Sequence, residues 1–337
     1  TLIFKVIAVS GMFLLVHKKE DYIIYGALTV TSNIGSYVIN FLRLGKYISL
    51  KPMGSYNLKR HIKPVGVFCA MTVANSIYTN LDTVMLKFIS GDEQTGYYNA
   101  AVYVKTAMVS LVISLGTVLL PRLSYYIEKD MQKEFKRITS HALSFVLMIS
   151  LPLAVYFMLF AEEGIGFLSG PAYAPAAVSM RLIMPTIIFI GLSNILGMQI
   201  LVPTGRERKV LQAVIAGSVI DLIINLLLIP ALGSCGATIG TLVAEFAVAL
   251  VEAVVLWQFL KEIWHMKRMV PYVAALIPSV AGAVALHRLV LQDVGNFLTL
   301  VFTALVFFGI YGAALLVQKE TITMEFVLPY VKKLCLT

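Results

Sequence analysis

The chain has 337 residues, of which 59% are hydrophobic and only 13% are charged. Water-soluble domains carry about 25% charged residues, so this composition excludes an ordinary soluble fold. The formal net charge is +9, which by itself would admit a nucleic-acid or membrane-surface partner.

Ten apolar runs alternate with short charged segments, and each approaches or exceeds the length of about 20 residues that a helix needs to cross a bilayer. We therefore expect an all-α, polytopic membrane protein with about ten transmembrane helices. The chain starts at Thr1 inside an apolar run and without a methionine, so we expect further sequence before it. In chain order the runs cover residues 1–16, 21–44, 65–89, 97–120, 140–160, 177–203, 210–231, 236–260, 271–286 and 297–317.

Basic residues mark alternate connections between these runs. Lys and Arg are concentrated in 43–63, 122–137, 206–209, 261–268 and the tail 319–333, whereas acids predominate in the connections at 92–93 and 162–163. Because Lys and Arg near span ends stay on the cytoplasmic side, the pattern predicts a cytoplasmic C-terminus. Topology thereby accounts for the positive charge, and no nucleic-acid partner is expected.

The segment 121–139 alternates charged and apolar residues. This pattern is typical of a short amphipathic helix at the inner membrane interface. A solvated turn that extends the fourth span explains it equally well. The sequence leaves both interpretations open.

Carboxylates inside the spans are costly, at about 2.5–3.5 kcal/mol each near the bilayer centre. Asp221 and Glu245 fall at similar depth on neighbouring antiparallel helices, so we expect them to face one another. Such a pair suits coupling to H⁺ or Na⁺, and we place Asp82 and Asn225 in the same candidate coupling site. The alternative is a polar clamp between helices, made by Asp221, Asn225 and Thr241. The intramembrane acids are Asp82, Asp221, Glu245 and Glu252.

Three cations also lie within or near the ends of spans. Lys105 lies about a third of the way down the fourth span, where it could bind a phosphate or pyrophosphate group in a cavity. An ion pair between Asp82 and Lys105 that fastens two helices is the alternative. Lys87 and Arg181 are further candidates, unless they extend outward to water. The amides expected to line the same cavity are Asn80, Asn99 and Asn194.

Motifs for catalysis or metal binding are missing from the sequence. It contains no P-loop, no Gly-x-Ser-x-Gly and no Asp-x-Asp of a sugar-nucleotide metal site. We expect no enzyme activity, no cofactor and no metal site. The histidines all fall in connections or at span ends, at His17, His61, His141, His265 and His287.

The stretch 80–104, NLDTVMLKFISGDEQTGYYNAAVYV, resembles the signature of the oligosaccharide flippases, the Wzx-type polysaccharide biosynthesis or O-antigen export proteins. Family members similarly carry Leu-Asp and a methionine in a span, then a short loop with glycine and acids, then Gly-Tyr-Tyr and alanines. A second matching block runs over 199–245, and Gly170 with Tyr173 forms a third. Asp221 stands where the family more often has asparagine.

The resemblance implies a two-bundle exporter fold of the multidrug, oligosaccharidyl-lipid and polysaccharide exporter superfamily. Residues 1–64 would then hold the last two helices of the first bundle and a cytoplasmic connecting loop. Residues 65–260 would form the second six-helix bundle, and 261–337 two extra helices and a cytoplasmic tail. Four spans of the first bundle would precede Thr1.

The function implied by the resemblance is to translocate a polyprenyl-pyrophosphate-linked oligosaccharide from the inner to the outer leaflet of the bacterial cytoplasmic membrane, by alternating access. The implied partners are the lipid-linked oligosaccharide, membrane lipids, and a polysaccharide polymerase with glycosyltransferases. One alternative is a cation-coupled multidrug or lipid-precursor exporter of the same superfamily. Another is a membrane-embedded glycosyltransferase or acyltransferase, which lacks an evident catalytic constellation.

Overall fold

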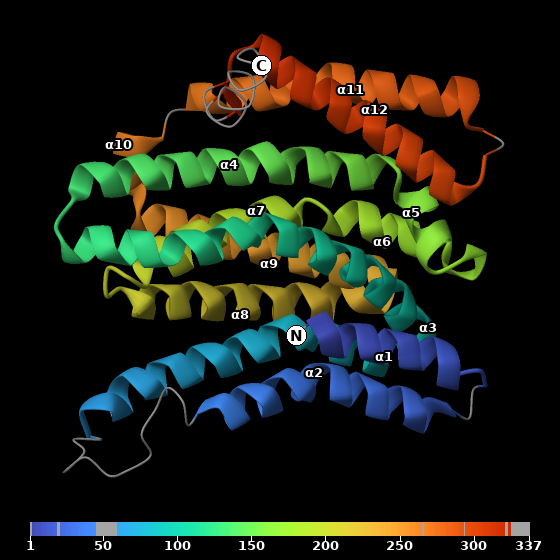
Figure 1. Ribbon diagram of the computed structural model, residues 1–337, viewed down its shortest axis with the longest axis horizontal. Coiled ribbons are helices and arrows are strands. Elements are labelled where there is room, and N and C mark those ends of the chain that lie inside the picture. The colour runs from blue at the N-terminus through green and yellow to red at the C-terminus, as the bar shows by residue number, and fades with distance from the viewer. Residues whose placement is uncertain are drawn as a thin grey trace. The chain divides into compact units, whose positions relative to one another are not determined.

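A computed structural model describes residues 2–18, 21–44, 59–264, 266–292, 294–320 and 323–324. Every regular element in these ranges is a helix (Figure 1). The chain divides into two compact units, Thr1–Ile62 and Lys63–Thr337.

The first unit contains α1 (Leu2–Leu15) and α2 (Tyr22–Leu44), which pack against each other. Gly11 lies against the side chain of Leu28, so a side chain at this position would collide with the neighbouring helix. Between the helices, the Asp21 carboxylate accepts hydrogen bonds from the backbone N–H groups of His17 (3.0 Å) and Lys18 (2.9 Å). These two bonds favour the ionised form and lower the pKa of Asp21.

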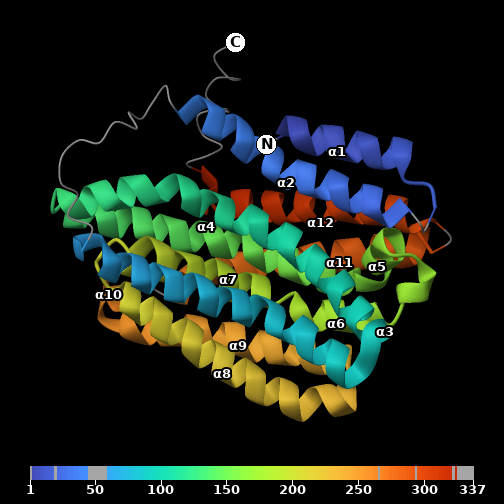
Figure 2. The same cartoon turned by 90° about the horizontal axis from the view of Figure 1, so that it is seen from below.

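The second unit begins within α3 (Lys59–Glu128), which holds the third and fourth expected spans as two arms of a hairpin (Figure 2). Gly91 breaks the helix with φ 85° and ψ −178°, a conformation open essentially to glycine alone. The Tyr98 hydroxyl reaches Asp82, 16 residues earlier. In a continuous helix these residues would be about 24 Å apart, so the contact requires the chain to reverse at Gly91.

The next span is one continuous helix with Pro152 inside it, and the one after it is broken. α4 (Gln132–Leu159) leads into α5 (Ala161–Leu168) and a short η2 (Pro171–Tyr173). The sixth expected span then comprises α6 (Ala176–Ile183), α7 (Thr186–Ser193) and the π-helical η3 (Asn194–Leu201). Pro185 lacks a backbone N–H and separates α6 from α7. The π-helical turn widens the last part of this span, and such turns are frequent at functional sites.

The remaining elements form two helical hairpins. α8 (Glu207–Leu232) and α9 (Ser234–Val255) meet at Gly233, which has a positive φ of 54°. Gly236 lies directly against the backbone of Leu228, so even one methyl group would separate the two helices. After α10 (Trp257–Ile263) and η4 (Met266–Met269), the second hairpin follows with α11 (Val270–Val290) and α12 (Asn296–Val317).

The α11/α12 hairpin packs on α4 through tyrosines whose hydroxyls cap backbone carbonyls. Tyr156 on α4 donates to the carbonyl of Leu300 (2.7 Å), and Tyr311 on α12 donates to that of Met148 (3.1 Å). The Tyr156 ring also contacts Phe307 at a centroid distance of 5.4 Å. Each tyrosine buries its ring and satisfies its hydroxyl, which suits an interface inside a membrane.

The class of fold is confirmed as an all-α, polytopic membrane protein. Among the described residues, six helices are long and apolar enough to cross a bilayer. A seventh span is possible in α3, where Asn80–Ser114 and Leu119–Glu128 are bent by 41°. Large apolar side chains project from these helices, such as Leu227 and Ile277, each 70% exposed, as expected for surfaces that face lipid. The total of ten spans stays a prediction.

In the segment 121–139, α3 continues to Glu128 and α4 begins at Gln132, with a turn at Asp130 between them. The part Leu119–Glu128 is bent by 41° from Asn80–Ser114. Both interpretations of the segment therefore stay predictions.

We expect Gly91→Ala to lower the free energy of unfolding by about 1–3 kcal/mol, because alanine at φ 85° is strained although nothing crowds its side chain. The measurement is chemical unfolding in detergent followed by circular dichroism. Gly309→Ala in α12 is the matched control: its added methyl group also meets open space, but the helical backbone favours alanine. Equal unfolding midpoints for the two variants would contradict the proposed turn.

Candidate functional site

A buried carboxylate joins three helices in the second unit. Asp82 on the first arm of α3 is only 3% exposed. It accepts hydrogen bonds from the hydroxyl of Tyr98 on the second arm, from Asn225 Nδ2 on α8 (2.6 Å) and from Thr241 Oγ1 on α9 (2.7 Å). The Tyr98 and Thr241 hydroxyls are 3.1 Å apart. Three donors around one carboxylate satisfy much of its hydrogen-bonding capacity away from water.

A second carboxylate lies beside the first. Asp221 precedes Asn225 by one helical turn on α8 and has no exposed surface. Neither of its carboxylate oxygens, nor Asn225 Oδ1, has a hydrogen-bond partner among the described residues. Asp82 and Glu245 both act electrostatically on Asp221, as does Lys105. We call Asp82, Tyr98, Asp221, Asn225 and Thr241 the Asp82 cluster.

The Asp82 cluster has the chemistry of a site for a small cation. Two carboxylates that share a low-dielectric site repel each other unless a proton or a cation lies between them. The unpartnered oxygens of Asp221 and Asn225, together with Asp82 and Thr241, form an oxygen-rich set of the kind that hard cations prefer. The cluster can therefore take up one proton or one metal cation such as Na⁺, and its charge balance favours doing so.

A pocket of about 330 Å³ lies between α3, α7, η3, α8 and α9, and we call it the polar pocket because charged and polar side chains stand among its mostly apolar walls. Lys105 and Glu245 line it together with Glu252, which is only 1% exposed. The Glu252 Oε2 atom has no partner among the described residues. The chain passes very close to this carboxylate at Gly197 in the π-helical turn, where a side chain would collide with it. The other polar residues that line the pocket are Thr106, Ser193 and Asn194.

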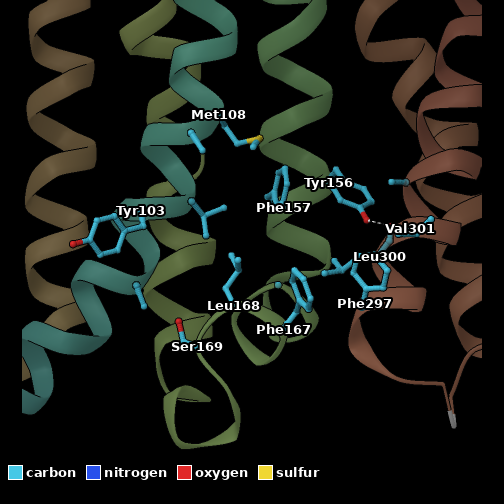
Figure 3. A pocket seen from close by; sticks show the side chains of 15 residues that line it. Tyr103, Met108, Tyr156, Phe157, Phe167, Leu168, Ser169, Phe297, Leu300 and Val301 are labelled. Carbon is cyan, nitrogen blue, oxygen red and sulfur yellow. Dashed lines mark hydrogen bonds between the residues drawn. The ribbon is translucent and has the colours of Figure 1, made fainter. Parts of the chain in front are cut away.

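An apolar pocket of about 590 Å³ lies on a different face of the second arm of α3, against α4, α5 and α12 (Figure 3). Its walls are mostly aromatic and aliphatic, with Tyr103, Phe157 and Phe297 among them. The hydroxyl of Tyr156 points away from the pocket toward α12 and bonds to the carbonyl of Leu300. Nothing in the sequence pattern alone distinguished these residues from ordinary apolar contacts between helices.

The structure gathers the four residues of the expected coupling site in and around the Asp82 cluster. Asp82, Asp221 and Asn225 lie in it, while Glu245 lines the polar pocket beside it. The expected clamp residue Thr241 binds Asp82 rather than Asp221. The ion pair between Asp82 and Lys105 is not what holds Asp82, since its partners are Tyr98, Asn225 and Thr241.

The expected substrate-binding residues do not all converge. Lys105 and Asn194 line the polar pocket. Lys87 instead pairs with Asp92 (3.1 Å) and Arg181 with Glu162 (2.6 Å), all four with side chains largely outside the core. Asn80 donates to the carbonyl of Ser76, and Asn99 accepts a weak hydrogen bond from Thr83 (3.4 Å).

Sequence reasoning left Tyr98 and Glu252 without a role. Tyr98 was noted only as part of the Gly-Tyr-Tyr motif, and nothing local shows that its hydroxyl reaches another helix arm. Glu252 follows Glu245 by seven residues, which places both on one face of α9. That spacing was a signal for a shared pocket.

We expect Thr241→Val to lower the free energy of unfolding by about 1–3 kcal/mol, because it removes one donor from a buried carboxylate. The midpoint of thermal unfolding in detergent measures this. Thr238→Val is the control on the same helix, since Thr238 is equally buried but its hydroxyl bonds only to the carbonyl of Cys235. A loss as large in Thr238→Val as in Thr241→Val would show that the Asp82 cluster does not stabilise this unit.

Two family models match the chain. "Polysaccharide biosynthesis protein" matches residues 1–127, and "MatE" matches residues 68–227. The second range contains Asp82, Tyr98, Asp221 and Asn225.

Curated relatives are similar over most of this chain. A protein named "Putative O-antigen transporter" from Shigella dysenteriae is 27% identical over 74% of the chain and 63% of its own length. One of the same name from Escherichia coli is 24% identical over 69% of the chain and 56% of its own length. An uncharacterised membrane protein of Methanocaldococcus jannaschii, MJ1068, is 27% identical over 82% and 54%. The chain thus spans between half and two thirds of the relatives' lengths.

A solved structure shares the fold. The lipid II flippase MurJ in an inward closed conformation superposes with a TM-score of 0.72, covering 98% of this chain and 67% of that one at 16% identity. The likeness concerns the arrangement of helices alone. The chain is thus similar in sequence to polysaccharide biosynthesis and MatE proteins and to relatives named as putative O-antigen transporters, and similar in fold to a lipid II flippase.

Proposed function

We propose that this chain belongs to a flippase that moves a polyprenyl-pyrophosphate-linked oligosaccharide from the inner to the outer leaflet during surface polysaccharide biosynthesis. One observation carries the proposal beyond the relatives' names. The second arm of α3 presents Lys105 and Thr106 to a polar pocket and Tyr103 and Val104 to a large apolar one. Neighbouring polar and apolar pockets suit a substrate with a sugar head and a hydrocarbon tail.

Bilayer physics explains why a protein is needed for this step. A sugar headgroup loses its hydrogen bonds to water in hydrocarbon, at a cost of several kcal/mol for each unpaired group. Polar side chains in a shielded cavity replace those bonds, while the polyprenyl tail stays in an apolar environment. In this scheme Asn194 contacts the sugar and Lys105 contacts the pyrophosphate. Lys87, Arg181, Asn80 and Asn99 are further candidate contacts along the path.

The expected architecture supports alternating access. Residues 65–260 would form the second six-helix bundle, 1–64 the end of the first bundle, and 261–337 the extra pair of helices. Rocking of one bundle against the other about a central cavity would expose the substrate to each leaflet in turn. The positive connections support a C-terminus on the cytoplasmic side of a bacterial cytoplasmic membrane. A polymerase and glycosyltransferases that make and consume the repeat units are the proposed protein partners.

The Asp82 cluster is the proposed coupling site. It takes up a proton or Na⁺ between Asp82 and Asp221, with Asn225 as a further ligand and Glu245 close by. Tyr98 on α3 and Thr241 on α9 complete the surroundings of Asp82, so loss of the cation would alter the packing of three helices at once. This links the cation to a conformational change, because a ligand shifts an equilibrium only through its differential contacts in the two states.

A cation-coupled multidrug exporter is the second candidate. The observation in its favour is that the MatE model covers both carboxylates of the Asp82 cluster. The two candidates share the coupling site and differ in what the pockets hold.

We expect Lys105→Gln to reduce export of lipid-linked repeat units by about tenfold or more, because a charge-assisted hydrogen bond to phosphate is worth about 1.5–3 kcal/mol. The measurement is complementation in a bacterium that lacks its own exporter, with lipid-linked intermediates counted on each side of the membrane. Lys133→Gln, in an exposed position at the start of α4, is the control and should complement normally. Unchanged export in Lys105→Gln would contradict the assigned contact. A separate experiment deletes the gene for this chain from its own host. If export of repeat units then continues unchanged while drug susceptibility alters, the multidrug exporter is favoured.

For the coupling site, we expect Asp82→Asn to abolish the stimulation of transport by an imposed cation gradient, since the amide cannot neutralise a bound cation. Transport into proteoliposomes is measured under a Na⁺ gradient and, separately, a pH gradient. Glu128→Gln, at an exposed position, should keep the response of the unmodified protein. If Asp82→Asn responds to both gradients as the unmodified protein does, coupling resides elsewhere.

A further inference from the structure

We propose that the polar pocket around Glu252 binds an ammonium group, so that the transported oligosaccharide carries a free amino sugar. The identity of the guest as a sugar rests on the proposed function, whereas the preference for an ammonium group rests on the pocket itself. The residues that carry the argument are Glu252 and Glu245 on α9, Lys105 on α3, and Ser193 and Asn194 at the junction of α7 and η3.

Glu252 is buried, and one of its two carboxylate oxygens lacks a hydrogen-bond partner among the described residues. Its side chain is 1% exposed, and Ser193 lies within hydrogen-bonding reach of it. The buried Oε2 atom nevertheless has no donor among the described residues, and the residue as a whole lines the pocket. An unpaired carboxylate oxygen in such a place costs about 1–3 kcal/mol or more. A donor supplied by a guest would recover that energy.

The charges around the pocket select the sign of the guest. Glu245 acts electrostatically on Glu252, so the two carboxylates disfavour each other's charge. Lys105 supplies one positive charge to the lining. When both carboxylates are ionised, two negative charges against one ammonium leave a net negative charge in a membrane-embedded pocket, where charges are weakly screened. A guest with a positive group next to Glu252 neutralises this excess.

The size and the lining of the pocket select the kind of cation. A volume of about 330 Å³ would hold about ten waters at about 30 Å³ each, far more than a dehydrated metal ion fills. An ammonium group offers three N–H donors in one place, which suits the Glu252 carboxylate and the oxygens around it. Thr106 and the amide nitrogen of Asn194 add polar groups to the lining for sugar hydroxyls, whereas Asn194 Oδ1 already accepts a hydrogen bond from Gln199 (3.2 Å). A sugar-sized amine therefore uses both the charge and the volume.

The position of the pocket separates this site from the Asp82 cluster. Glu252 lies 11 residues beyond Thr241 on α9, which corresponds to about 16 Å along the helix. Glu245 lies between the two and acts electrostatically on both Asp221 and Glu252. Uptake of a small cation in the cluster would thus be felt at the pocket through Glu245.

The test compares the affinities of glucosamine, N-acetylglucosamine and glucose for the full chain in lipid nanodiscs. Saturation-transfer NMR at constant ionic strength measures the binding of each sugar. The amino sugar should bind about tenfold more tightly than its acetylated form, which lacks the charge. Glu252→Gln should reduce this ratio to about one, and Glu128→Gln should leave it unchanged. Glu245→Gln, at a half-buried position, is a second variant if Glu252→Gln does not fold, and should reduce the ratio severalfold.

Three outcomes would overturn the inference. The first is equal binding of the three sugars. The second is a preference for glucosamine that persists in both Glu252→Gln and Glu245→Gln. The third is displacement of glucosamine by NaCl but not by choline chloride, because that would identify a site for an inorganic cation. The export assay with Lys105→Gln reports on the proposed function independently. Selective binding of the amino sugar without export of repeat units would contradict only the flippase proposal. Export without selectivity for the amino sugar would contradict only this inference.

Discussion

The free-energy cost of burying the Asp82 carboxylate away from water determines how the helices around it are arranged. Asp82 is buried where water cannot reach it, so its oxygens must be satisfied by side chains. The donors come from the other arm of α3, from α8 and from α9. One charge thereby fixes the relative depth and rotation of the helices that bear the candidate site. Asp221, placed next to it without donors, is the reason why we propose this contact as a cation-coupling site.

The second arm of α3 is the element through which the other features are connected. Tyr98 near its start bonds to Asp82, Lys105 lines the polar pocket, and Tyr103 lines the edge of the apolar one, with its hydroxyl directed away from the other labelled side chains (Figure 3). A rotation of this arm would change all three environments together, because they lie on different faces of one helix. The proposed cation binding, headgroup contacts and tail contacts would therefore be coupled through this one helix arm.

Glycine and the π-helical turn allow the close approaches that the site needs. Gly197 lets η3 pass beside the Glu252 carboxylate, and Gly240 lets α9 approach Asn225 and Asp221. Larger residues would push the helices apart and open the buried carboxylates to lipid or water. Small residues are generally what permits close packing where lipid cannot drive helices together. The polar centre and the tight packing thus depend on each other.

The sequence alone determined the class of fold, because long apolar runs have no stable alternative to spanning helices. It also indicated Asp82, Asp221, Asn225 and Glu245 as a group, since charges are too costly in a membrane to be placed at random. It could not show that Tyr98 and Thr241 hold Asp82, that Lys87 and Arg181 pair with Asp92 and Glu162, or that two pockets flank α3. Those facts depend on how helices distant in sequence are rotated against one another. Helical periodicity shows which residues share a face, but only tertiary packing decides which face meets which partner.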